Sequence, residues 1–408
     1  MPGFFLSASS PCGYRRLETG GIQVHGAAVK HMLKIAIIKG VIASYSEGFY
    51  DRLFSHSDLF VRVYCQDHIP GMDLKTVHHK YANNVKLLKF ISLKNDKLSW
   101  QCIPWKEILR GYDIVFIQGN PRNLSQLLFA TYLRLIGRKV ILWTQGHSFQ
   151  SNAITENIRL LWSRMFRFLL LYTDAEVSYL RRKGFTSNYM LGQNNGLDQR
   201  RIESAILLWN DHRSNEWRKQ HDLENRFLIL SCARLSAKNK LCQFVQALPK
   251  IIVQIPNVMW CIIGSGKEKA ELTSMVFDFG VADHVRFVGE LYDEEDLAPW
   301  FLSSHIFVHP AAIGLSMMHA FGYGLPVITH GNAYRQGPEY GAFEAEVTGR
   351  TFEQDNIQSL SDAVITLLKD EDARLRMKHN VKKIAREDYN VDVMVERFIK
   401  IARQAYAS

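Results

Sequence analysis

The 408-residue sequence lacks the compact motifs that mark the commonest metal and nucleotide sites. It has no His-Glu-x-x-His, no Cys-x-x-Cys pair, and no Asp-x-Asp pair after a strand-like run. It also lacks a P-loop and a complete Gly-x-Gly-x-x-Gly fingerprint. These absences argue against zinc enzymes, P-loop NTPases and dinucleotide-binding enzymes, and we expect neither a metal nor another cofactor.

Cysteine and long apolar runs are scarce as well. No stretch approaches the roughly 18 to 20 apolar residues that span a bilayer. Residues 1–31 lack the basic start and long apolar core of a signal peptide, and we interpret them as a disordered extension, a cloning remnant or the result of an upstream start. The six cysteines are scattered, at positions 12, 65, 102, 232, 242 and 261. This pattern predicts reduced thiols and a cytoplasmic protein.

The remaining composition is that of a globular protein with a basic charge. Hydrophobic residues make up 47% of the chain, and the length suits two domains, each with its own core. The net charge of +10 suits nucleic acid, an anionic membrane or a phosphate-bearing ligand. No nucleic-acid-binding module and no basic face with interleaved aromatics is present, so we expect no nucleic-acid partner.

Short apolar runs alternate with helical patterns, which predicts βαβ units and parallel sheets. In the first half, the expected helices include Arg122–Ile136 and Ile154–Tyr172. The expected strands there are Leu33–Lys39, Phe60–Tyr64, Asp113–Ile117, Lys139–Thr144 and Ala175–Ser178. Residues 199–222 are polar and hold no buried strand, so we expect a linker between domains 32–198 and 223–385.

The alternation restarts in the second half. The expected strands are Phe227–Ala233, Met259–Gly264, Val285–Gly289, His305–Pro310 and Pro326–Thr329. The expected helices are Leu241–Gln254, Lys267–Gly280, Asp293–Ser303, Ser316–Tyr323 and two or three more up to Ala405. The pattern predicts an α/β protein of two Rossmann-like domains that face a central cleft, with ligands outside the carboxyl ends of the strands.

Two loops of the second half place ligand-binding groups at strand ends. Arg234 and Lys240 lie in a basic loop after a strand, where cations neutralise a diphosphate. Gly264 and Gly266 end the next strand and allow close approach of a ligand to the backbone. A solvated basic loop and a tight structural turn explain the same residues without function.

The segment 309–329 carries the strongest signal. Its pattern predicts a strand, a loop of small residues, a helix that ends at a glycine, and a buried strand. Gly314, Leu315 and Ser316 head the helix, and free N–H groups there form an anion site. We expect Ser316 to be the N-cap.

These elements together resemble glycosyltransferase family 4. The resemblance rests on the basic loop 234–240, Gly264-Ser265-Gly266, Val285–Leu291, the His309-Pro310 loop and Ala320–Thr329. Asn194–Asp198 looks like the family's Asn-Gly-x-Asp at the domain junction. The family implies the GT-B fold, retention of anomeric configuration and a nucleotide-diphosphate sugar as donor. It also implies a glycan or lipid-linked acceptor, as in cell-surface polysaccharide or lipopolysaccharide synthesis.

The resemblance also implies roles for single residues. Many members carry two glutamates where this chain has Ala311 and His319, so His319 is expected to replace the acid that holds the ribose. His147, at the end of a strand, is expected to touch the donor sugar or the acceptor, although a structural histidine is the alternative. Gly40 lies in the matching loop of the first domain. Glu339 either returns a carboxylate to the cleft or is a surface turn residue. Arg234 and Lys240 would stabilise the leaving diphosphate.

Three alternatives stay open at this point. Without the two acids, the chain could be a non-catalytic binding subunit, or a GT-B-fold epimerase or phosphorylase.

Residues 158–171 combine apolar residues with arginines, which suits either a core helix or a helix on an anionic membrane at its cytoplasmic face. The last segment, 386–408, is expected to be a helix that crosses back to the first domain.

Overall fold

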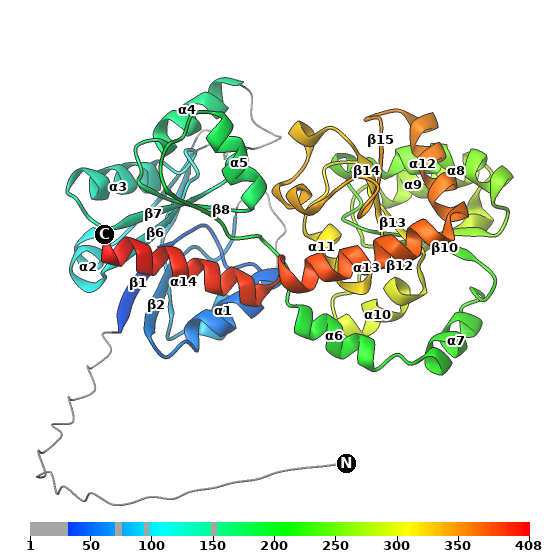
Figure 1. The fold of residues 1–408 in the computed structure, drawn as a ribbon, viewed down its shortest axis with the longest axis horizontal. Coiled ribbons are helices and arrows are strands. Elements are labelled where there is room, and N and C mark those ends of the chain that lie inside the picture. The colour runs from blue at the N-terminus through cyan, green and yellow to red at the C-terminus, as the bar shows by residue number, and fades with distance from the viewer. Residues whose placement is uncertain (1–31, 70–75, 94–97, 148–152) are drawn as a thin grey trace, which may run out of the picture.

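A computed structural model describes residues 32–69, 76–93, 98–147 and 153–408 of the chain. The expected extension 1–31 lies outside these residues. The described chain forms two α/β domains side by side, and the last helices run across both of them (Figure 1). Each domain has its own parallel sheet, which confirms the predicted fold class.

The first sheet has seven parallel strands in the order β3-β2-β1-β6-β7-β8-β9. Strands β1, β6, β7 and β8 are buried, as expected where helices cover both faces of a sheet. The bounds are β1 Leu33–Ile38, β2 Leu59–Cys65, β3 Val85–Leu87, β6 Ile114–Gln118, β7 Val140–Thr144, β8 Phe168–Leu171 and β9 Tyr189–Gly192, with a separate antiparallel pair of β4 Phe90–Leu93 and β5 Leu98–Gln101. Its helices are α1 Glu47–Phe54, α2 Trp105–Gly111, α3 Leu124–Leu135, α4 Ala153–Ser163 and α5 Asp174–Arg182.

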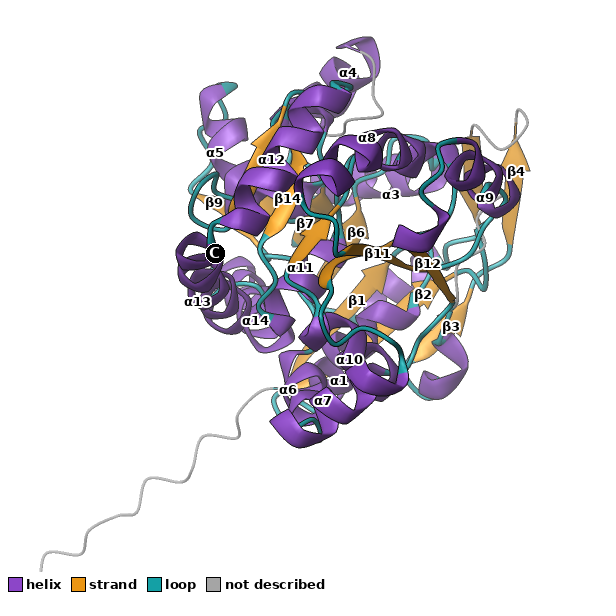
Figure 2. Ribbon diagram, turned by 90° about the vertical axis from the view of Figure 1, so that its right-hand side faces the viewer, coloured by secondary structure: helices purple, strands orange, loops and turns teal. Residues whose placement is uncertain are grey.

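The second sheet has six parallel strands in the order β12-β11-β10-β13-β14-β15. They are β10 Phe227–Cys232, β11 Val258–Ile263, β12 Val285–Gly289, β13 Ile306–Val308, β14 Val327–His330 and β15 Gly349–Phe352. Helices flank both sheets (Figure 2). Those of the second half are α8 Leu241–Gln254, α9 Lys269–Asp278, α10 Glu294–Ser303, α11 Leu315–Tyr323, α12 Ile357–Lys369 and α13 Glu371–Glu387.

The region 153–182 differs from the prediction. The single helix expected over 154–172 ends at Ser163, and Phe168–Leu171 forms the buried strand β8 between β7 and β9. The strand expected at Ala175–Ser178 is wrong, because these residues lie in α5. Thr173 caps that helix by accepting a hydrogen bond from the Glu176 N–H. A short apolar run fits a buried helix and a buried strand equally well, which explains the error.

The segment expected as a linker is helical. It forms α6 Gln199–Leu207 and α7 Asp211–Gln220, and Ile202 and Ala205 lie in the core of the second domain. Its polar composition reflects the outer faces of two helices that pack on α10.

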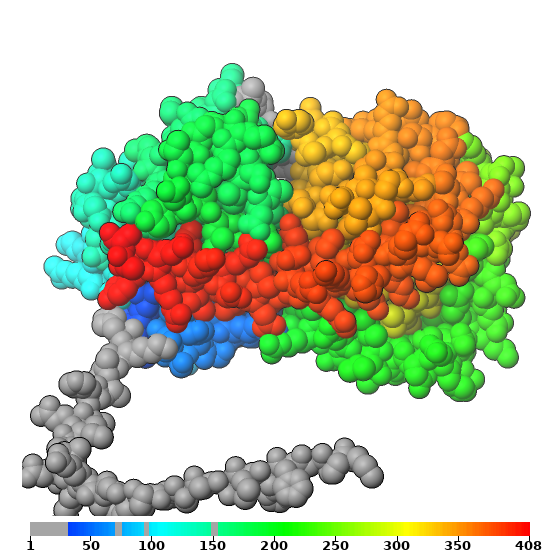
Figure 3. All heavy atoms as spheres, in the orientation of Figure 1, coloured from blue at the N-terminus to red at the C-terminus, as the bar shows by residue number. Residues whose placement is uncertain are grey.

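The final helix, α14 Val391–Ala407, returns to the first domain and packs on α1 and on the first sheet. Its Phe398 is fully buried, with its ring 4.0 Å from that of Phe116 between centroids. Figure 3 shows α13 and α14 as a continuous band over both domains. The chain therefore crosses between the domains twice, at 193–198 and at 388–391.

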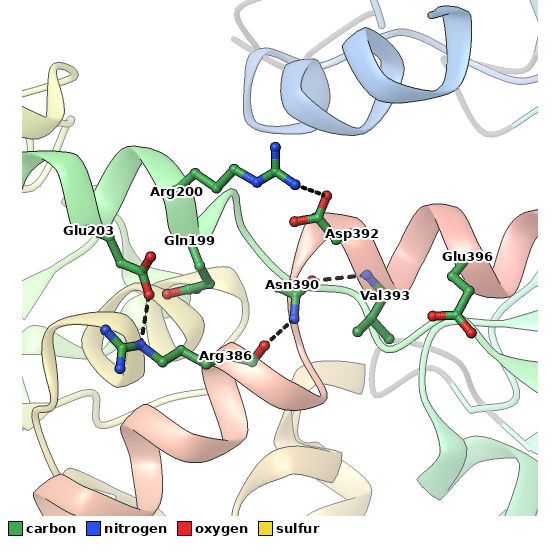
Figure 4. A pocket seen from close by; sticks show the side chains of 8 residues that line it. All are labelled: Gln199, Arg200, Glu203, Arg386, Asn390, Asp392, Val393 and Glu396. Carbon is green, nitrogen blue, oxygen red and sulfur yellow. Dashed lines mark hydrogen bonds and ion pairs between the residues drawn. The ribbon is translucent and has the colours of Figure 1, made fainter. Parts of the chain in front are cut away.

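Ion pairs hold the two crossings together (Figure 4). Arg200 pairs with Asp392 at 3.0 Å, and Arg386 pairs with Glu203 at 2.7 Å. Asn390 caps α14 by accepting a hydrogen bond from the backbone N–H three residues on. The pocket lined by these side chains lies at the crossing, and it involves none of the residues that the sequence singled out.

Candidate functional site

The carboxyl ends of the two sheets face each other, as several contacts between the domains show. The imidazole Nε2 of His147, after β7, lies 2.8 Å from the carbonyl oxygen of Tyr334, after β14. The side-chain amide of Asn195, after β9, donates to Glu339 Oε1 at 2.6 Å. A side chain at Gly341 would meet Thr173. Two of the residues predicted to bind a ligand, His147 and Glu339, therefore lie at the boundary between the domains.

In the second domain, the first turn of α11 lies near this boundary. Gly314 is the N-cap, and Leu315 and Ser316 follow it in the helix. The expectation that Ser316 caps the helix is wrong, because the helix begins two residues earlier. The N–H groups of a first helical turn have no intrahelical acceptor, and they favour an anion. The structure thus brings Gly314, Leu315 and Ser316 together in the first turn of α11.

Gln336 holds the loop in front of this helix, and the sequence did not single it out. It is buried; its Oε1 accepts from the Ile313 N–H at 2.8 Å, and its Nε2 donates to Thr329 and to the His330 carbonyl. His309 bonds to the carbonyl of Ala311 at 3.1 Å, and burial lowers the pKa of this histidine to about 4. The loop is therefore fixed by neutral hydrogen bonds.

Glu339 is a buried carboxyl at the boundary and not a surface turn residue. Its Oε2 lies 3.7 Å from the position that a Cβ on Gly314 would take. Burial raises the pKa of Glu339, and the hydrogen bond from Asn195 opposes that rise. The carboxyl of Glu339 therefore lies beside the first turn of α11.

His319 is held in a hydrogen-bonded network instead of pointing freely at a ligand. Its Nε2 lies 3.0 Å from Glu294 Oε2, and the Tyr323 hydroxyl donates to the same oxygen at 2.8 Å. Burial raises the pKa of Glu294, but the hydrogen bonds and charge of His319 and the Tyr323 hydroxyl outweigh it, and the pKa is lowered. His319 is thus paired with a carboxylate that comes from α10.

Three loops at the ends of β10, β11 and β12 lie side by side. The Leu235 N–H donates to the Ser265 carbonyl at 2.7 Å, and the Gly264 N–H to the Gly289 carbonyl at 2.7 Å. Gly264 and Gly266 have φ of +138° and +155°, and a Cβ on either would lie 2.1 Å from a carbonyl oxygen of the β10 loop. These glycines are therefore required by the packing of the loops themselves.

The two predicted cations occupy different parts of the β10 loop. Arg234 is exposed. Hydrogen bonds from Ser265 and Tyr292 lower the pKa of Glu290, and the charge of Arg234 adds to that shift. Because β10 pairs with β13, the loop of Arg234 neighbours the loop that leads to α11. Lys240 has φ +50°, and its Nζ lies 2.5 Å from Asp355 Oδ1. Arg234 thus lies beside the loop that leads to α11, whereas Lys240 is paired with Asp355.

In the first domain, His147 follows β7 and Gly40 follows β1, with β6 between these two strands. The buried carboxyl of Glu176 accepts from the N–H groups of Gly146 and Tyr172, each at 2.9 Å, and fixes the loop of His147. Burial raises the pKa of Glu176 to about 7. The Gly40 N–H donates to Gln118 Oε1 at 2.8 Å. His147 also contacts Glu156, so both of its ring nitrogens have partners.

The described residues contain no group of three or more His, Cys, Asp or Glu side chains placed to hold a metal ion. No helix among them is long and apolar enough to cross a membrane.

Comparisons with known proteins fit this arrangement. Residues 213–384 match the family "Glycosyl transferases group 1". A 178-residue segment, 42% of the chain, is 28% identical to 25% of a Bacillus subtilis poly(glycerol-phosphate) alpha-glucosyltransferase. A 172-residue segment, 40% of the chain, is 29% identical to 43% of a GDP-mannose-dependent alpha-(1-6)-phosphatidylinositol monomannoside mannosyltransferase of Mycobacterium tuberculosis. The chain thus spans less than half of these relatives.

The whole fold has counterparts among solved structures. Anabaena HepE in complex with UDP superposes with a TM-score of 0.68 at 15% identity, over 91% of this chain and all of that one. A glycosyltransferase of Rickettsia africae gives a TM-score of 0.67 at 12% identity, over 91% of this chain and 98% of the other. The fold is GT-B, as expected.

Proposed function

From the premise that residues 213–384 form a group 1 glycosyl transferase domain, we propose that the chain is a retaining glycosyltransferase. It transfers a hexosyl group from a nucleotide-diphosphate sugar to a glycan or lipid-linked acceptor. The observation that carries the proposal is the first turn of α11, which opens at the boundary of two GT-B domains beside the buried Glu339.

The proposed roles follow from charge and position. The α11 turn and Arg234 bind the diphosphate and stabilise the charge that develops on it as the sugar leaves. Lys240 adds positive charge once it exchanges Asp355 for phosphate. The His319–Glu294 pair holds the ribose, and the first domain holds the acceptor with His147 nearby. Two cations and a helix dipole supply the charge stabilisation, so we expect chelators to leave the rate unchanged.

A panel of sugar nucleotides tests this function. We expect at least one UDP- or GDP-sugar to raise the melting temperature of the full chain and to be consumed with release of nucleoside diphosphate. An epimerase would give a new sugar nucleotide without release, and a binding subunit would bind the donor without turnover. Either result, or the absence of any binding, would contradict the proposal.

Membrane docking is a further part of the proposal; it uses the exposed apolar face of α4, which overlaps the helix first expected, and not its arginines. Arg159 is buried and donates a hydrogen bond to the Gly146 carbonyl. Helix α4 therefore does not present arginines to the solvent. The helix does expose Ile154, Ile158 and Leu161 in one stripe, and Arg164 follows it.

We expect the chain to float with anionic vesicles at low salt and to be released at high salt, because exposed charges are screened over about 8 to 10 Å. Leu161→Glu should weaken flotation, whereas Leu207→Glu, on the exposed face of α6, should not. Equal recovery of the chain with neutral and anionic vesicles at both salt concentrations would refute docking.

A further inference from the structure

Glu290 is an exposed carboxylate in the loop between β12 and α10, and the proposed reaction does not yet use it. The Ser265 hydroxyl donates a hydrogen bond to its Oε1, and the Tyr292 hydroxyl donates to its Oε2 at 3.0 Å. Both donors come from the ends of strands in the second sheet, since Ser265 follows β11 and Tyr292 follows β12. The two hydrogen bonds therefore hold an exposed carboxylate in one orientation.

The carboxylate of Glu290 can accept more hydrogen bonds than it receives from the protein. An ionised carboxylate has about four lone-pair positions for donors. In the part of the chain that the structure describes, Glu290 accepts from Ser265 and Tyr292, one bond to each oxygen. These bonds lower its pKa, so the group is charged at neutral pH. Each of the two adjacent oxygens thus keeps a position for a donor group of a ligand.

Hydrogen bonds and strand pairing place Glu290 close to the loop of Arg234. Strand β11 pairs with β10 on one side and with β12 on the other. The N–H of Leu235, the residue after Arg234, donates to the Ser265 carbonyl at 2.7 Å, and the Ser265 side chain binds Glu290. Ser265 therefore connects the loop of the proposed diphosphate cation to the carboxylate.

Charge and position decide which part of the donor meets Glu290. A carboxylate repels the diphosphate, which the proposed function assigns to Arg234 and the first turn of α11. The proposed function assigns the ribose to His319, whose partner Glu294 begins α10. Glu290 lies in the loop that leads directly into that helix. The base is the uncharged part of a nucleotide on the far side of the ribose from the phosphates, so the base is the part that Glu290 would meet.

The common bases differ in the donors that they offer to a carboxylate. Guanine has two neighbouring donors, N1–H and the 2-amino group. Uracil has one N–H between two carbonyl oxygens, and adenine has an amino group next to a ring nitrogen that accepts. Because a carboxylate only accepts, its second oxygen would face an acceptor of uracil or adenine. Guanine alone among these three bases satisfies both oxygens.

We propose that Glu290 binds the base of the donor and selects guanine, through N1–H and the 2-amino group. Ser265 and Tyr292 are positioning residues that orient the carboxylate. The inference rests on the proposed function, because it assumes that a nucleotide-diphosphate sugar occupies the second domain. It names the class of donor, a guanosine diphosphate sugar.

Calorimetry of the full chain with GDP, IDP, UDP and ADP tests this assignment. IDP differs from GDP only by the missing 2-amino group, so the ratio of the two affinities reports on that group alone. We expect the wild type to bind GDP at least ~10-fold more tightly than IDP, as for a hydrogen bond to a charged group. We also expect it to bind GDP more tightly than UDP or ADP.

The variants separate base recognition from a general effect of charge. Glu290→Gln keeps the size of the side chain and replaces one acceptor oxygen with an amino group, so the ratio of GDP to IDP affinity should fall close to one. The matched control, Glu295→Gln, removes the same charge from an exposed side chain in the first turn of α10 and should keep the wild-type ratio. Both side chains are exposed, so the melting temperatures should stay near that of the wild type.

Three results would overturn the assignment. They are wild-type binding of UDP or ADP as tight as that of GDP, equal wild-type affinities for GDP and IDP, and a wild-type ratio that survives in Glu290→Gln. The proposed function would stand in each case, because a nucleotide would still be bound. Failure of the proposed function itself would look different, as a wild-type chain that binds no nucleoside diphosphate.

Discussion

Arg234→Ala is expected to lower turnover of the donor by ~100-fold, the usual loss when a donor that stabilises developing charge is removed. Arg234 is exposed at the carboxyl end of β10, next to the loop that leads to α11. Lys240→Ala is expected to reduce turnover as well, and less than Arg234→Ala, because its ammonium is paired with Asp355. The rate of nucleoside diphosphate release, measured at saturating donor, gives both values.

Two lysines serve as controls for these variants. Lys238 lies exposed in the same loop, and Lys250 pairs with Asp362 on the surface of α8. Alanine at either position should leave the rate within about twofold of wild type, because exposed surface charges contribute little. Near-wild-type turnover in both Arg234→Ala and Lys240→Ala would show that the diphosphate binds elsewhere.

Phe398→Ala is expected to destabilise the first domain by about 3–5 kcal/mol, the usual cost of truncating a buried phenylalanine. The ring is fully buried, and it packs against Phe116, Phe49 and Trp143. The last helix of the chain thus completes the core of the domain that begins it. Denaturant unfolding of wild type and variant, followed by circular dichroism, measures this loss of stability.

Lys400→Ala provides the comparison on the same helix, because Lys400 is exposed on α14. Its effect should stay within about 0.5 kcal/mol. If Phe398→Ala proved as mild, α14 would not be an integral part of the first domain.

The second domain could be predicted from the sequence almost strand by strand. Its strands β10 to β14 are short apolar runs, and the observed bounds differ from the expected ones by at most two residues. The glycine loop, the basic loop and the α11 turn were found because each directly follows such a strand.

The first domain was harder to predict where local signals compete. Phe168–Leu171 continues the apolar pattern of α4, and only the pairing with β7 and β9 makes it a strand. Contacts between distant residues were equally out of reach. Nothing in the sequence places Glu294 against His319, or Gln336 against Ile313, because these pairs depend on how α10 and the β14 loop pack around α11.

Titration of the purified chain with UDP, GDP and their sugar conjugates tests the central claim most directly. The account predicts that at least one of these ligands binds at a single site per chain and that its sugar conjugate is then turned over. A chain that shows the melting transition of a folded protein and binds none of them would contradict the assignment of the α11 turn as a nucleotide-sugar site.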